Sequence, residues 1–170
     1  MRSSARKIVP NSELELPAIV ARCRADPEML GRLRQIHLQA DRAVARTLAA
    51  AADGPAVMCL GGGGCCKFDL FGHRLFLTVG ELALLTSEPP ADLGPARRGR
   101  CPYQLGGRCT AYPRRPLGCR TFFCRNEKKF PLQRVHEHFH GLIRRLHQSR
   151  SIPYAYGELP GLVAQLFVDQ

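Results

Sequence analysis

Residues 101–124 read CPYQLGGRCTAYPRRPLGCRTFFC and hold four of the eight cysteines of this 170-residue chain. The Gly106–Gly107 pair stands between two short segments and is typical of a β-hairpin turn. Pro113 and Pro116 precede the last two cysteines and indicate a loop there. The stretch therefore predicts a hairpin followed by a loop, with thiols as the candidates for functional chemistry.

Of the four cysteines upstream, three complete the pattern C-x5-C-C, a gap, and then C-x7-C-x9-C-x4-C. The candidate metal ligands are Cys59, Cys65, Cys66, Cys101, Cys109, Cys119 and Cys124. Four thiolates can hold a tetrahedral zinc ion or an iron–sulfur cluster, whereas magnesium and other hard cations prefer oxygen ligands. The set predicts a zinc or iron centre, either of four cysteines with spares or completed by a histidine. The adjacent Cys65 and Cys66 point in different directions from an extended backbone, so they could serve two metals or leave one thiol for redox chemistry.

Helical patterns lie on both sides of the thiol region. Asp26-Pro27-Glu28 predicts the start of an amphipathic helix that runs to about residue 51, and Cys23 before it is expected to be a small buried residue. Residues 74–77 predict a short strand, and Thr78 with Glu81 forms a capping-box pattern for a helix over 79–86. Further helices are expected over 131–148 and 158–168.

These elements predict one small α-rich α+β domain, in which helices flank a loop and β-hairpin that carries a cysteine-cluster metal centre. We expect residues 1–25 to be an N-terminal arm and residues 26–170 to be a single metal-binding domain with its motif core at 59–124. A chain of this length suits one domain.

The net charge of +11 is concentrated in one segment. Residues 97–134 hold eleven basic residues and one acidic residue, a balance of +10. Three interpretations stay open. Arg115, Arg120 and Arg125 could compensate clustered thiolates, because nearby cations lower thiol pKa values. The basic segment could instead bind nucleic acid, with stacking by Tyr103, Tyr112, Phe122 and Phe123. It could also be an ordinary solvated face.

Two histidines in the predicted helix over 131–148 are weaker ligand candidates. His136 and His140 share one helix face at a spacing that can bind metal. These residues stand in the order His136-Glu137-His138-Phe139-His140, which has the His-Glu-x-x-His spacing, with Glu137 beside the first histidine.

Several classes are excluded or disfavoured. The glycine run 61–64 is not followed by Gly-Lys-Ser/Thr, so it is not a nucleotide P-loop. No apolar run approaches the length of a spanning helix, which disfavours a membrane protein. The first residues lack the apolar region of a secretory signal, and many cysteines in a reducing compartment favour metal ligands over disulfides. We therefore expect a cytoplasmic protein.

The cysteine motifs and their flanking residues resemble one known family. The matching stretches are Gly63-Gly64-Cys65-Cys66, Leu77-Thr78-Val79-Gly80-Glu81-Leu82, Cys101-Pro102-Tyr103, Gly107-Arg108-Cys109-Thr110-Ala111-Tyr112 and Arg115-Pro116-Leu117-Gly118-Cys119-Arg120-Thr121-Phe122-Phe123-Cys124. They are similar to the zinc- or iron-chelating domain family of YkgJ-type cysteine-cluster proteins. The resemblance spans about 59–124 and implies metal chelation by the cysteines. Many members carry a further cysteine three positions before the vicinal pair, where this chain has Gly62. A methylase of flagellin lysines has a similar cluster, but this sequence shows no methyl-donor site.

Three function hypotheses follow. The first is a metal-binding protein that chelates zinc or iron, with an iron–sulfur cluster as one form of the iron. The second is a metal-dependent redox or group-transfer enzyme that acts on a protein or nucleic acid. The third is a basic nucleic-acid-binding module with a structural metal.

Overall fold

The computed structural model describes residues 15–50, 66–68, 72–122 and 129–168, with the side chains of 129–131 left aside. The described chain is rich in helix and has two small antiparallel sheets, as the predicted α-rich α+β class requires. The helices are α1 Leu16–Arg24, α2 Pro27–Ala50, α4 Val79–Leu85, α5 Gly94–Arg97, the 3₁₀ turn η2 Tyr112–Arg114, α6 Leu117–Thr121, α7 Lys129–Ser149 and α8 Leu159–Leu166. The strands are β1 Phe76–Thr78, β2 Gln104–Leu105, β3 Arg108–Cys109 and β4 Tyr156–Glu158. No helix within the described ranges is both long and apolar enough to cross a bilayer.

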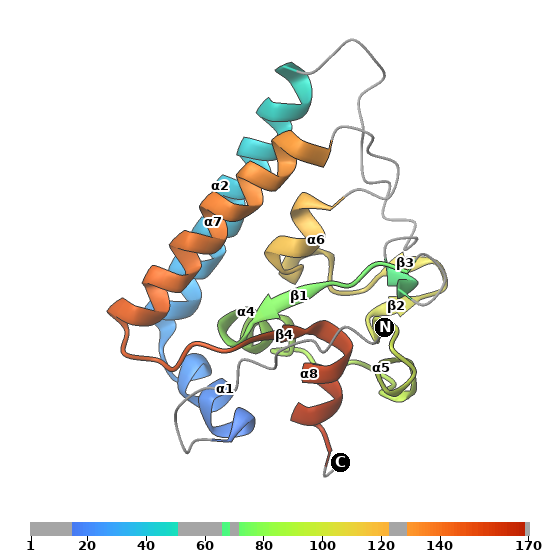
Figure 1. The fold of residues 1–170 in the computed structure, drawn as a ribbon. Helices are drawn as coiled ribbons and strands as arrows, with labels where there is room; N and C mark the ends of the chain where they lie inside the picture. The colour runs from blue at the N-terminus through green and yellow to red at the C-terminus, as the bar shows by residue number, and fades with distance from the viewer. Residues whose placement is uncertain (1–14, 51–65, 69–71, 123–128, 169–170) are drawn as a thin grey trace, which may run out of the picture.

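Helices α2 and α7 form a long antiparallel pair along one side of the molecule (Figure 1). The predicted start of α2 is confirmed, because Asp26 Oδ1 accepts a hydrogen bond from Met29 N at 2.9 Å. The amphipathic pattern predicted for α2 agrees with its burial, since Leu33, His37, Ala40 and Val44 are buried. Leu33 and Ala40 pack with Phe139 and Ile143 of α7. The pair forms a scaffold against which α6 packs.

Strand β1 pairs with β4, which brings the C-terminal part of the chain against its middle. The register places Phe76 opposite Glu158 and Thr78 opposite Tyr156. The chain enters α4 directly from β1, and the predicted capping box between Thr78 and Glu81 is present. Figure 1 shows the β1–β4 ribbon crossing the centre of the molecule, with α6 on one side and α8 on the other.

The buried side chains form two core clusters. The first lies around α1, α4, α8 and the cysteine-bearing loops, and it contains Cys23, which is fully buried as expected. The second lies between α2, α7 and α6 and is centred on Leu33, Leu117 and Ile143. Helix α6 stands between the two clusters, because Leu117 belongs to the second while Cys119 packs against the first.

Three features differ from the elements expected from the sequence. Helix α1 lies inside the segment predicted as an N-terminal arm, and four of its residues, Leu16, Ile19, Val20 and Cys23, are buried in the core. Short helix α6 stands where a loop was expected, and α5 lies in a segment for which no helix was predicted. Strand β4 was not expected, since residues 156–158 carry no alternating pattern and become a strand only by pairing with β1.

Candidate metal centre

Four of the seven predicted ligands lie within the described residues. Cys66 and Cys101 are buried, whereas Cys109 and Cys119 are half-buried. The other three, Cys59, Cys65 and Cys124, lie outside the described residues.

Backbone contacts bring three of the four described cysteines into one small region. Cys101 N donates a hydrogen bond to Cys66 O at 3.3 Å, so that two segments far apart in sequence meet. Cys101 O accepts from Gln104 N at 3.3 Å, and Gln104 pairs with Cys109 in the β2–β3 hairpin. The predicted turn is confirmed: Gly106 and Gly107 have φ values of +56° and +77°, the left-handed conformation that this tight turn needs at both positions.

The fourth described cysteine, Cys119, lies on α6, and the buried Glu81 fixes where this helix begins. Glu81 Oε1 accepts from Leu117 N, the first residue of α6, at 2.7 Å. The same oxygen lies 3.1 Å from His37 Nε2 on α2. Because an ionised carboxylate only accepts, His37 donates this hydrogen bond. Glu81 therefore joins the capped end of α4 to α2 and to the helix that carries Cys119.

Hydrogen bonding keeps Glu81 ionised. Burial alone would raise its pKa, but the hydrogen bond and charge of His37, together with the backbone N–H groups of Thr78 and Leu117, lower the pKa to about 2. A carboxylate that accepts several hydrogen bonds is stabilised in its charged form.

Arg120 has a structural role beyond the charge compensation considered above. Its guanidinium donates to Arg115 O at 2.8 Å, to Pro113 O at 2.9 Å and to Asp41 Oδ2 at 2.5 Å. Burial lowers the pKa of Arg120, and the charges of Asp41 and Cys119 oppose this effect. Arg120 thereby holds the loop before α6 and ties it to α2, while its interaction with Cys119 remains compatible with thiolate stabilisation. Arg125 lies outside the described residues.

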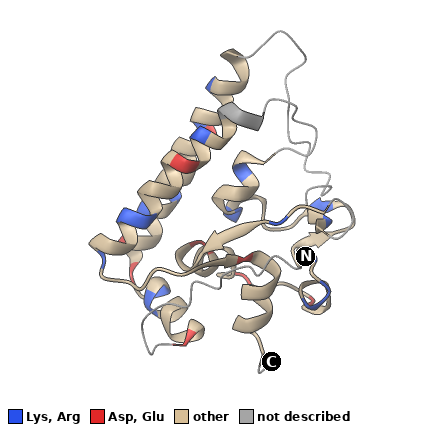
Figure 2. Cartoon of the chain, in the orientation of Figure 1, with Lys and Arg blue, Asp and Glu red and all other residues tan. Residues whose placement is uncertain are grey.

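The described aromatic residues of the basic segment, Tyr103, Tyr112 and Phe122, have partners within the chain, and Phe123 lies outside the described residues. Tyr103 is 3% exposed, and its hydroxyl donates to Glu88 O at 3.1 Å. Burial raises its pKa. The Arg115 guanidinium lies 3.6 Å from the ring centroid of Tyr112, and the Phe122 ring stacks on His73. Lys and Arg are spread over several elements, with Asp and Glu between them on the α2–α7 pair (Figure 2). These positions give little support to the nucleic-acid hypothesis.

His136 and His140 lie on one face of α7 as predicted, with ring centroids 5.7 Å apart. Each ring has a hydroxyl partner: His136 Nδ1 lies 2.9 Å from Thr121 Oγ1, and His140 Nε2 lies 2.7 Å from Tyr154 Oη. Burial lowers the pKa of both imidazoles, which favours their neutral forms. Sequence reasoning missed Thr121 and Tyr154, because a single hydroxyl residue has no pattern that marks it as a histidine partner.

Within the described residues, no three His, Cys, Asp or Glu side chains are grouped so as to hold a metal ion. No family model, curated protein or solved structure matches the chain. The support for a metal centre is the donor chemistry of the cysteines and the backbone contacts between the segments that carry Cys66, Cys101 and Cys109.

Proposed function

We propose that this protein binds zinc or iron through its cysteine cluster, with an iron–sulfur cluster as one form of the iron. The observation that carries the proposal is the convergence of Cys66 and Cys101 through a backbone hydrogen bond, with Cys109 on the adjoining hairpin. Thiolates are ligands that zinc and iron–sulfur clusters prefer. The resemblance to YkgJ-type cysteine-cluster proteins supports the same donor set.

The chain's own residues would hold such a centre in specific ways. The Gly106–Gly107 turn brings Cys109 back beside Gln104, next to the Cys101 loop, and the Glu81 carboxylate positions α6 with Cys119. Zinc would supply a structural cross-link, whereas an iron–sulfur cluster would supply electron transfer. The redox form is the one that the second hypothesis, a redox or group-transfer enzyme, requires.

The test is metal analysis of protein purified without oxygen, combined with an absorption spectrum. We expect about one zinc ion or one iron–sulfur cluster per chain. Cys109→Ser should remove most of the bound metal, because a serine hydroxyl stays protonated at neutral pH and is a poor ligand for these metals. Cys109 is half-buried, so the helical content of this variant should persist in circular dichroism.

Cys23→Ala is the matched control, because Cys23 is a cysteine of α1 that lies outside the predicted ligand set. This variant should keep its metal. The proposal fails if anaerobically purified protein contains neither zinc nor iron, or if both variants lose metal equally. A visible absorbance band that bleaches on reduction would select the iron–sulfur form, and a colourless zinc protein would remove the redox hypothesis.

A further inference from the structure

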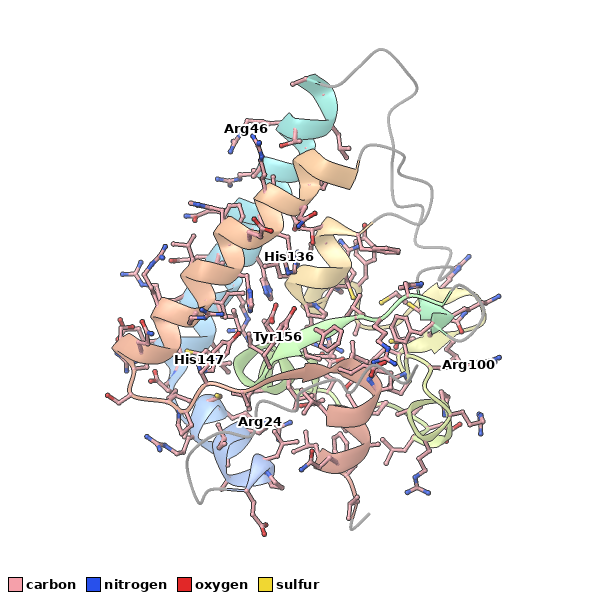
Figure 3. The ribbon with its side chains drawn as sticks, viewed as in Figure 1. Arg24, Arg46, Arg100, His136, His147 and Tyr156 are labelled. Atoms are coloured by element: carbon pink, nitrogen blue, oxygen red, sulfur yellow. The ribbon has the colours of Figure 1, made fainter. Side chains whose placement is uncertain are left out.

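A pocket of about 340 Å³ lies between α6, α7 and the β1–β4 ribbon. Residues that matter for its chemistry are Arg74, Phe76, Thr121, Gln133, His136 and Tyr156. Figure 3 shows His136 on α7 and Tyr156 on β4 near the space between these elements. The volume lies in the range of small-molecule sites, which is about 300–1,000 Å³. None of the described lining residues is a cysteine, although Gly118 and Thr121 lie on α6 together with Cys119.

One tautomer of His136 presents a hydrogen-bond acceptor at this pocket. Thr121 Oγ1 lies 3.0 Å from Leu117 O and can donate its single proton there. When the hydroxyl donates there, His136 Nδ1, 2.9 Å from the same oxygen, carries a proton and donates it to the hydroxyl. In the neutral imidazole this leaves the lone pair on Nε2, and Nε2 has no hydrogen-bond partner in the part of the chain that the structure describes.

Aromatic rings form one wall of the pocket. The rings of Phe76 and Tyr156 stack with centroids 5.6 Å apart at an interplanar angle of 27°. On α7, the His140 ring lies 4.6 Å from the Tyr156 ring and supports it. Such a wall favours a flat, apolar ligand over a flexible or strongly hydrated one.

One charged side chain, Arg74, is among the described residues that line the pocket, and the charges of Glu81 and Glu137 act on His136 from nearby. Arg74 is exposed, and it makes no ion pair with the described residues. No Asp or Glu is found among the described residues that line the pocket. A carboxylate or phosphate on the ligand could therefore pair with the Arg74 guanidinium.

We propose that this pocket binds a small aromatic acid that carries a hydrogen-bond donor. The aromatic ring would pack on Phe76 and Tyr156, its donor would point to His136 Nε2, and its anionic group would contact Arg74. This inference goes beyond the proposed metal binding, because it uses none of the cysteines.

Isothermal titration calorimetry with three related probes tests the ligand class. The probes are 4-hydroxybenzoate, which has the ring, the donor and the anion, benzoate, which lacks the donor, and phenol, which lacks the anion. We expect saturable one-site binding of 4-hydroxybenzoate, with both truncated probes weaker by about tenfold or more, since each lost charge-assisted or buried hydrogen bond has this order of effect. Equal affinity for the three probes, or no saturable binding of 4-hydroxybenzoate at millimolar concentration, would overturn the proposal.

Protein variants locate the site. His136→Gln and Arg74→Gln should each lower the affinity for 4-hydroxybenzoate about tenfold. Arg74→Gln should barely change the affinity for phenol, which lacks the anion. His136→Gln should barely change the affinity for benzoate, which lacks the donor. His138→Gln is the matched control, because His138 is an exposed histidine of the same helix that does not line the pocket. An effect of His138→Gln as large as that of His136→Gln would contradict the proposed site.

The Cys109→Ser protein separates this inference from the proposed function. If Cys109→Ser lowers the metal content and leaves 4-hydroxybenzoate affinity within about twofold of the parent, both sites exist and are independent. If the parent protein lacks metal but still binds the probe with the expected selectivity, only the metal proposal fails.

Discussion

Glu81 accepts hydrogen bonds from three separate parts of the chain: Thr78 beside it, His37 on α2 and Leu117 at the start of α6. The capping box with Thr78 could be predicted, because its two residues stand at a fixed spacing that local helix geometry requires. The other two partners could not, since His37 and Leu117 are 44 and 36 positions away and approach Glu81 only after the helices pack.

The depressed pKa of Glu81 makes stability depend on pH. The folded pKa of about 2 lies below the ordinary value of 4.5, so the contribution of this carboxylate is fully present above about pH 4.5. It falls as pH drops from about 4.5 toward 2, and its full size is about 3 kcal/mol. Glu81→Gln should lower the free energy of unfolding by about 2–4 kcal/mol at pH 7, because the amide N–H₂ of glutamine would face N–H or O–H donors. Urea unfolding measured from pH 7 to pH 3 checks both effects. The free energy of unfolding of the variant should depend less on pH at the acid end of this range than that of the parent.

Glu88→Gln provides the control for Glu81→Gln. Glu88 pairs with Arg114 at 2.6 Å, but its side chain is 72% exposed. Loss of such a surface pair should change the free energy of unfolding by less than about 1 kcal/mol. If Glu81→Gln is no more destabilising than Glu88→Gln, Glu81 does not organise the fold as described.

At the level of elements, α4 packs so closely against α2 and α7 that it requires glycine at position 80. A Cβ added to Gly80 would lie 2.7 Å from Met29 Cε and 2.8 Å from His147 Nε2. The Met29 side chain can move, but the His147 ring is fully buried. Gly80→Ala should therefore lower the free energy of unfolding by about 1–3 kcal/mol.

Gly31→Ala on α2 gives the opposite expectation. Nothing lies within 4 Å of a Cβ added there, and Gly31 sits inside a helix. Alanine should stabilise this helix by about 0.5–1 kcal/mol through reduced chain entropy in the unfolded state. Chemical denaturation of the two variants beside the parent measures both changes, and equal shifts would refute the close packing of α4.

The elements that sequence analysis predicted well are those with local causes. The cap of α2 and the Gly106–Gly107 hairpin each depend on residues within a few positions of one another. Pairing of β1 with β4 depends on contact between residues 76–78 and 156–158, so it leaves no local pattern. The same limit applies to the pocket beside His136, which needs α6, α7 and both strands in place. For the candidate metal site, the residue type was enough to name the candidate ligands. The contact between Cys66 and Cys101 could not be predicted, because it joins two segments that are far apart in the sequence.

Across the whole molecule, the described cysteines are unequally distributed between the two core clusters. Cys66 and Cys101 belong to the first cluster, and Cys109 and Cys119 pack against it. The second cluster, between α2, α7 and α6, is built from aliphatic and aromatic residues such as Leu33, Phe139 and Ile143. A metal bound by the cysteines would therefore stabilise the first cluster directly and the second only through α6.

Metal removal should consequently loosen one part of the protein before the other. After treatment with a strong chelator, we expect hydrogen exchange to accelerate by at least about tenfold at hairpin amides such as Thr110 N, which donates to Tyr103 O at 2.8 Å. Amides in the middle of α7, around Ile143, should keep their protection, because their packing partners lie on α2. Exchange measured by mass spectrometry on peptides from both regions distinguishes the outcomes. Uniform acceleration would show that the two clusters unfold as one unit, and unchanged exchange at the hairpin would show that its cysteines do not hold the metal.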